Sequence, residues 1–118
     1  MKLPYSEQAV VPEEKLTTYL LDETHQEGRG KALFFQRFGF SVAQWEVLAQ
    51  ALLAHAHEHQ VVKTEGTKFG TRYVVEGALA TPVGRRPAVR VVWFIRSGES
   101  APRLVTAYPV EDGNDQRT

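Results

Sequence analysis

The sequence predicts a single α+β domain in which N-terminal helices pack on a C-terminal antiparallel sheet of three to four strands. Three observations support this fold class. Apolar residues recur at helical spacing up to Gln60 and with a period of two after it. The strand-like segments are joined by short turns, which favours antiparallel pairing. Helical and strand-like segments are segregated along the chain rather than alternating, as is typical of α+β proteins.

Three helices are predicted in the first half of the chain. The first begins at Pro12, carries Leu16, Tyr19 and Leu20 on one apolar stripe and ends near Leu21. A polar loop at 22–30 precedes a second helix at 30–38, which glycine at position 39 should terminate. Ser41 has the position of the next N-cap, with Gln44 three residues later as the partner of a capping box, and that helix continues to about residue 59.

Strands are predicted at 72–79, 89–96 and 103–110, and the segment 63–70 can add a short fourth strand. In the central strand, every second residue from Val89 to Ile95 is apolar, so this set should face the core. Pro109 cannot donate to a strand ladder, which places the end or the edge of the sheet there. We expect residues 1–110 to form one domain and residues 111–118 to form a polar tail.

Composition excludes several classes of function. The chain of 118 residues has no cysteine, so disulfide bonds, thiolate metal sites and a cysteine nucleophile are excluded. It has no apolar run typical of a signal peptide or of a membrane span, so we expect a cytoplasmic protein. Fourteen basic residues balance fourteen acidic residues, which argues against a non-specific nucleic-acid binder. Five arginines but only one acid lie between Arg85 and Arg103, a pattern that suits a phosphate-bearing ligand and equally a solvated strand face.

The loop before the second helix contains the first candidate site. Its glycines, Gly28 and Gly30, let backbone amides approach an anion closely at a helix N-terminus, with Arg29 and Lys31 beside them. His25 can titrate near neutral pH and act as a general acid or base. An ordinary glycine-rich connector is the alternative interpretation of the same residues.

A second candidate is the pair His55 and His59, which share one face of the third helix and could hold zinc with a third ligand. A solvated last helical turn is the favoured interpretation, because histidine suits the negative end of the helix dipole. We therefore expect no metal and no cofactor.

The last two strands carry a third cluster of polar side chains: Arg90, Arg96, Arg103, Thr106 and Tyr108. Arg90 has apolar neighbours on its strand face and so needs a partner, either an acid such as Glu76 or a bound phosphate. Thr106 and Tyr108 are two residues apart, so they share a face and can offer hydroxyls to one ligand. A structural salt bridge with a half-buried tyrosine explains the cluster without any ligand.

These segments together resemble an uncharacterised family of small bacterial domains that occur alone and at the C-termini of polymorphic toxins. The resemblance rests on the patterns Leu16-Thr17-x-Tyr19-Leu20-Leu21, His25-x-x-Gly28-x-Gly30-Lys31-Ala32-x-x-Phe35, Phe38-Gly39-Phe40, Gly70-x-Arg72-Tyr73, Gly84-Arg85, Val91-x-Trp93-x-Ile95 and Pro102-Arg103-Leu104-Val105-Thr106-Ala107-Tyr108-Pro109. The layout is similar, more distantly, to ribonuclease toxins such as barnase, the tRNA-cleaving colicins and RelE.

This resemblance implies metal-independent cleavage of RNA, in which a ribose 2′-hydroxyl attacks the adjacent phosphate. His25 would be the general base or acid, Lys31 with Arg90 or Arg103 would bind phosphate, and Thr106 and Tyr108 would position the substrate. RNA and a cognate inhibitor protein would be the partners. The alternative is a non-catalytic protein-binding, immunity or regulatory module. The enzyme hypothesis predicts that His25, Lys31, Arg103 and Tyr108 meet in one cleft.

Overall fold

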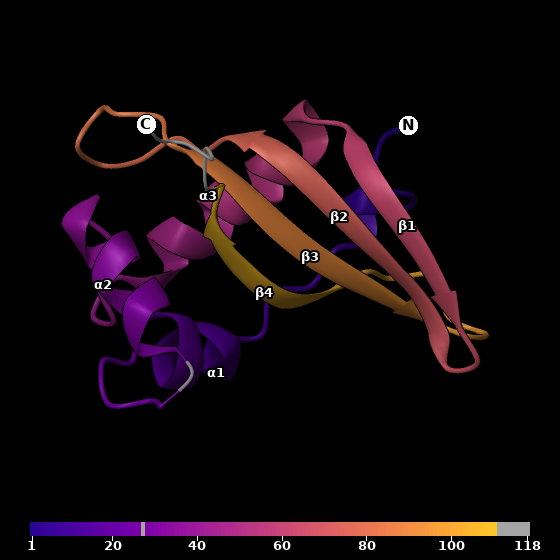
Figure 1. Cartoon of the computed structure of the whole chain (residues 1–118), viewed down its shortest axis with the longest axis horizontal. Coiled ribbons are helices and arrows are strands. Elements are labelled where there is room, and N and C mark those ends of the chain that lie inside the picture. Colours follow the sequence, from indigo (N-terminus) through magenta and orange to yellow (C-terminus); the bar gives the residue numbers. More distant parts are fainter. Residues whose placement is uncertain (27, 111–118) are drawn as a thin grey trace, which may run out of the picture.

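Helices form the first half of the molecule and a four-stranded sheet forms the second. The computed structural model describes residues 1–26 and 28–110, so the predicted tail at 111–118 lies outside the described residues. Figure 1 shows the elements, which follow the chain in the order η1 (Ser6–Gln8), α1 (Glu13–Lys15), η2 (Leu16–Leu20), α2 (Arg29–Arg37), α3 (Trp45–Glu58), β1 (Val61–Thr67), β2 (Gly70–Ala78), β3 (Ala88–Arg96) and β4 (Arg103–Pro109). The predicted α+β class is confirmed.

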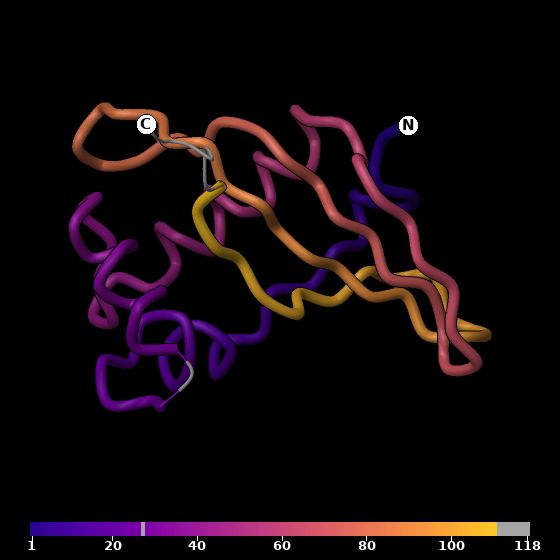
Figure 2. Tube along the Cα trace, viewed as in Figure 1, coloured from indigo at the N-terminus to yellow at the C-terminus, as the bar shows by residue number. Residues whose placement is uncertain are grey.

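The sheet is an antiparallel meander with the strand order β1-β2-β3-β4. The predicted fourth strand is present as β1. The register between β3 and β4 shifts after the pair Val92 and Thr106, because Trp93 pairs with Leu104 and leaves Val105 as an extra residue. Figure 2 shows β4 as a curved yellow trace beside the orange trace of β3.

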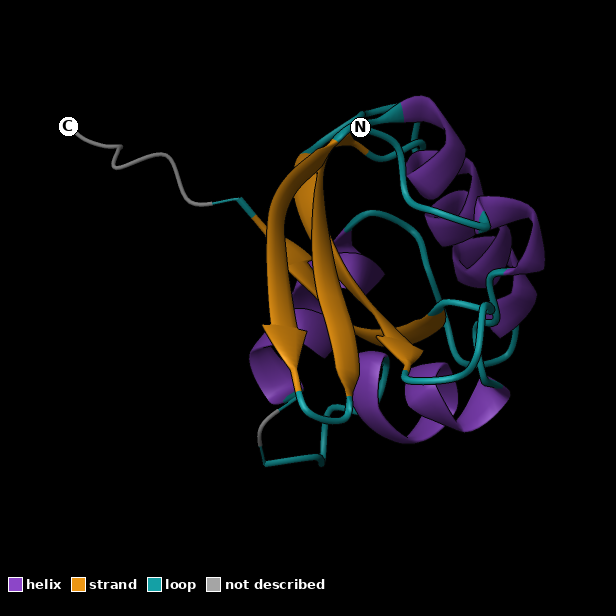
Figure 3. Cartoon of the chain, turned by 90° about the vertical axis from the view of Figure 1, so that its right-hand side faces the viewer, coloured by secondary structure: helices purple, strands orange, loops and turns teal. Residues whose placement is uncertain are grey.

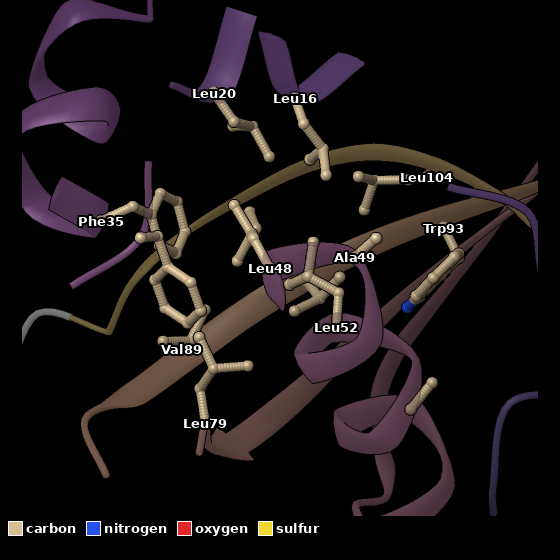
Figure 4. Close-up of a cluster of buried hydrophobic side chains, with 14 of the residues drawn as sticks. Leu16, Leu20, Phe35, Leu48, Ala49, Leu52, Leu79, Val89, Trp93 and Leu104 are labelled. Carbon is tan, nitrogen blue, oxygen red and sulfur yellow. The ribbon is translucent and has the colours of Figure 1, made fainter. Parts of the chain in front are cut away.

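The helices leave one face of the sheet uncovered. In Figure 1, α3 lies behind the sheet, while α1 and α2 lie beside β4, and in the side view of Figure 3 most helical turns lie on one side of the strands. Side chains from both layers point toward one another in Figure 4 and form one buried cluster that includes Leu16, Leu20, Phe35, Leu48, Leu52, Val89, Val91 and Trp93. The predicted inward set of β3 is therefore buried except for Ile95, which is half-buried near the strand end.

The first predicted helix is only partly α-helical. It begins after Pro12 as expected, but the part from Leu16 to Leu20 is a π-helix, closed by a hydrogen bond of 2.8 Å from the Leu21 amide to the Leu16 carbonyl. Leu16 and Leu20 are fully buried, whereas Tyr19 is only half-buried. The wide turn anchors the segment through its leucines and leaves the tyrosine at the surface of the core.

The predicted start of the third helix is wrong by several residues. Ser41 accepts the Gln44 amide hydrogen at 3.3 Å, but this bond belongs to a turn that precedes the helix, and α3 begins at Trp45. Gln44 is therefore the N-cap residue rather than the partner of a capping box.

The predicted solvated last turn of α3 is also wrong, because His55 is 1% exposed. Its Nε2 atom lies 3.1 Å from the carbonyl oxygens of both Gly77 and Val89, and His59 Nε2 lies 2.7 Å from the Ala78 carbonyl oxygen. The two imidazoles thus join the end of α3 to β2 and β3. Over residues 1–26 and 28–110 there is no group of three or more His, Asp or Glu side chains placed to hold a metal ion.

No helix in the described part of the chain is long and apolar enough to cross a membrane.

Candidate functional site

The segment preceding α1 runs along the edge of β4 and brings the first helices to this strand. The Val10 amide donates to the Pro102 carbonyl at 2.8 Å, and the Leu104 amide donates to the Val10 carbonyl at 3.0 Å, which forms a short parallel bridge. An open cleft of about 540 Å³ lies between the helical segment and the strand; its walls are Pro12, Glu14, Lys15, Thr18, Tyr19 and His25 on one side and Arg103, Leu104, Val105 and Thr106 on the other. We call it the β4 cleft.

Tyr19 is the most connected polar side chain of the β4 cleft. Lys31 Nζ donates a hydrogen bond of 2.7 Å to its hydroxyl, and the same hydroxyl lies 3.1 Å from Thr106 Oγ1. Partial burial acts to raise the pKa of Tyr19, but the hydrogen bonds from Lys31 and Thr106 and the positive charges of Lys31 and Lys15 lower it below its ordinary value. The site therefore stabilises the phenolate of Tyr19 more than water does.

His25 stands edge-on to Tyr19, with 4.9 Å between the ring centroids. Its Nδ1 atom accepts the Gly28 backbone N–H at 3.0 Å, so the neutral imidazole carries its proton on Nε2. The His25 backbone carbonyl also accepts the Arg29 amide hydrogen at 2.9 Å. The loop ahead of α2 is thus folded back on His25 and fixes the orientation of its ring.

Gly28 is required by the close approach of this loop to the helical segment. A Cβ atom at position 28 would collide with the Tyr19 carbonyl oxygen and crowd its ring, whereas a Cβ atom at Gly30 would meet nothing within 4 Å. The amides of Gly28 and Arg29, predicted to bind an anion, donate to His25 instead. Anion binding by Gly28, Arg29 and Gly30 stays a prediction.

The outer face of the sheet, opposite α3, carries the remaining predicted residues. Cross-strand pairing aligns Glu76, Arg90 and Tyr108 in one row. Of the two partners predicted for Arg90, the structure contains the acid: Arg90 Nε donates to Glu76 Oε2 at 2.6 Å. This hydrogen bond and the carboxylate charge, with a smaller contribution from Tyr108, raise the pKa of Arg90.

The predicted residues are distributed over two hollows rather than one cleft. His25, Arg103 and Thr106 line the β4 cleft, while Lys31, Arg90 and Tyr108 line a second hollow of about 430 Å³ on the outer face together with Pro109. The hydrogen bond between Lys31 and Tyr19 connects the two. Of the four residues expected in one cleft, His25 and Arg103 line the β4 cleft, whereas Lys31 and Tyr108 line the neighbouring hollow.

Three residues of the β4 cleft with ionisable side chains, namely Glu14, Lys15 and Tyr19, were not predicted as site residues. Tyr19 shares helical spacing with Leu16 and Leu20, and this pattern indicates a core position. Only the π-helical turn directs its hydroxyl to β4, and the sequence carries no signal for that turn. The sequence around Glu14 and Lys15 is typical of exposed charges in a first helical turn.

The fold and the site define a small α+β domain with a polar cleft at the β4 edge of its sheet. Residues 2–111 match the family model DUF6883, described as a domain of unknown function, and the chain belongs to this family. The search of curated proteins found no match. A solved chain from a contact-dependent growth inhibition toxin–immunity protein complex of Klebsiella pneumoniae 342 is similar, with a TM-score of 0.67 and 19% identity over 86% of this chain and 100% of that chain. At this identity the similarity shows a shared fold.

Proposed function

We propose that this domain is a toxin-type ribonuclease that cleaves RNA without a metal ion in the β4 cleft. The observation that carries the proposal is the phenol of Tyr19, whose hydroxyl contacts Lys31 and Thr106 beside the ring of His25. Two further cationic residues, Lys15 and Arg103, line the same cleft and suit a phosphate. The shared fold with a chain from a toxin–immunity complex agrees with this class of protein.

The geometry favours a division of roles. Tyr19 in its ionised form takes the proton of the ribose 2′-hydroxyl, because Lys31 and Thr106 stabilise the phenolate. The 2′-oxygen then forms a bond to phosphorus, the bond from phosphorus to the 5′-oxygen breaks, and the departing oxygen takes a proton from solvent, to which the cleft is open. Tyr19 returns its own proton to solvent and completes the cycle.

His25 stabilises the bound phosphate in this scheme. Its Nδ1 atom accepts the Gly28 amide hydrogen, which fixes the ring at the wall of the cleft beside Tyr19. Arg103 and Lys15 bind the charge that develops on the phosphoryl group as the 2′-oxygen attacks. In this proposal the base is Tyr19, a residue that the sequence pattern did not single out, and the predicted acid–base role of His25 stays a prediction.

Cleavage of total RNA in EDTA tests the proposal. We expect Tyr19→Phe and His25→Ala each to lower the cleavage rate about 100-fold or more, as loss of a general base or of a transition-state donor does in other enzymes. Tyr5→Phe and His57→Ala are matched controls, because both residues are exposed and lie outside the β4 cleft. Wild-type rates in the Tyr19 and His25 variants would contradict the proposed site.

The alternative function is a non-catalytic immunity or regulatory module that binds a partner protein. The same structural similarity favours it, since the similar chain comes from a complex of a toxin with its immunity protein. The RNA assay separates the two functions: a binding module leaves RNA intact whether the wild-type protein or either variant is added.

A further inference from the structure

We infer that the outer face of the sheet beside the β4 cleft binds the nucleotides next to the cleavage site on the same single strand of RNA. This inference rests on the proposed function, which it deepens by giving the enzyme an extended, single-stranded substrate. Three features of the outer face carry it: its shape, its charge and its continuity with the cleft.

The outer face is hollowed along two rows of aligned side chains. Pairing between strands sets Glu76, Arg90 and Tyr108 in one row, and Val74 beside Val92 in the next. These residues line a hollow of about 450 Å³ that reaches across the sheet to β1. A depression with an apolar floor and polar walls suits a nucleobase flanked by phosphates.

The charge of this hollow favours a phosphodiester. Arg90 and Glu76 pair with each other at 2.6 Å, so they largely cancel. The other charged side chains that line this hollow are the basic Lys63 and Arg72 and the acidic Glu65. Three basic side chains line the hollow against two acidic ones, so its lining carries one net positive charge although the whole chain is neutral, which favours an anionic strand here.

Lys31 connects the β4 cleft with the second hollow, the one of about 430 Å³. Its Nζ atom donates to the Tyr19 hydroxyl at the β4 cleft, and the same side chain lines the second hollow with Arg90 and Tyr108, which also line the hollow that reaches β1. A strand that leaves the cleft therefore passes the Lys31 ammonium before it reaches the sheet. The half-buried ring of Tyr108 lies next on this path and offers a surface on which a base can stack.

Binding of uncleavable 2′-O-methyl RNA, followed by fluorescence anisotropy, tests the subsite apart from catalysis. We expect a strand of about eight nucleotides to bind wild-type protein at least 10-fold tighter than a dinucleotide, because only the longer strand reaches the outer face. Tyr108→Ala should weaken binding of the long strand about 10-fold and leave the dinucleotide unaffected. Lys63→Gln should also weaken binding of the long strand and make this binding less dependent on salt.

Tyr5→Ala and Lys68→Gln are the matched controls, since both side chains are exposed and lie outside both hollows of the outer face. Equal affinity for short and long strands, or unchanged long-strand affinity in both Tyr108→Ala and Lys63→Gln, would overturn the subsite. Circular dichroism of each variant shows whether it is folded. Cleavage of total RNA by a protein with length-independent binding would remove only the subsite, whereas tight, Tyr108-dependent binding without cleavage would retain the subsite and remove the proposed catalysis.

Discussion

The hydroxyl of Tyr19 contacts Lys31, 12 residues away in the chain, and Thr106, 87 residues away. Residue spacing identified Lys31 and Thr106 as polar candidates but indicated a core role for the tyrosine between them. The difference is physical: the lowered pKa of Tyr19 depends on partners from two other elements, and no local pattern encodes such contacts. Candidate chemistry could therefore be predicted residue by residue, whereas the residue that joins the candidates could not.

His55 likewise takes its properties from its surroundings. Its Nε2 atom faces two backbone carbonyl oxygens and so carries a proton, while Nδ1 is buried with no hydrogen-bond partner in the described part of the chain. Burial lowers the pKa of His55 below its ordinary value of 6.5, and the nearby His59 adds to this effect against the opposing hydrogen bond to the Gly77 carbonyl. The folded protein therefore keeps His55 neutral under conditions in which the unfolded chain binds a proton.

Acidification should destabilise the protein through His55. Because the folded pKa lies below the unfolded value, the stabilising effect is complete above 6.5 and is lost as the pH falls through that value toward the folded pKa. We expect the Tm of the wild-type protein to fall between about pH 7.5 and about pH 5.5. We expect a smaller fall for His55→Gln, which keeps an N–H donor but cannot titrate.

His57→Gln is the control for this measurement, because His57 is exposed on the same helix. Its Tm should follow the wild-type dependence on pH. If His55→Gln and the wild-type protein lose the same stability on acidification, the buried imidazole is not the group responsible.

Helix α2 and the strands lie close to their predicted ranges, because the periodicity that indicates them is local. The expected helix at 30–38 is observed as Arg29–Arg37, and the expected central strand at 89–96 as Ala88–Arg96. The π-helical turn of η2 and the register shift in β4 were not predicted. Both features depend on how one element packs against another, and the sequence of a single segment does not show this packing.

The two glycines at the start of α2 should respond in opposite ways to alanine. Gly28→Ala places a methyl group against the Tyr19 carbonyl, which should cost about 1–3 kcal/mol of unfolding free energy and displace His25. Gly30→Ala meets open space in the first turn of α2 and should be neutral or stabilising by up to about 1 kcal/mol. Urea denaturation of both variants measures the difference. Equal effects would show that the close approach of the loop to Tyr19 does not restrict position 28.

The whole molecule combines a helical layer on one face of the sheet with an outer face that the helices leave uncovered. The spacing of apolar residues and the order of the predicted elements indicated the α+β class, and the structure confirms it. They did not predict that the chain before α1 lies along β4, a placement made by the parallel bridge between Val10 and Arg103. That bridge brings the helical wall to the strand and splits the predicted single site into two connected hollows.

The zero net charge of the chain conceals a local cluster of basic side chains. The chain has equal numbers of basic and acidic residues, so it has no bulk attraction for nucleic acid. Lys15, Arg103 and Lys31 nevertheless lie around the cleft and the adjoining hollow. The proposed ribonuclease would therefore recognise RNA at one place on the surface, where Tyr19 and His25 would carry out the chemistry.

The ends of RNA fragments made in EDTA show whether the domain cleaves RNA through its 2′-hydroxyl. Attack by the 2′-hydroxyl leaves a 2′,3′-cyclic phosphate on one fragment and a 5′-hydroxyl on the other, and mass spectrometry distinguishes both from the products of water attack. We expect these ends for the wild-type protein and for Tyr5→Phe, and their loss in Tyr19→Phe. Fragments with 5′-phosphate ends, or intact RNA after incubation with folded wild-type protein, would contradict this expectation.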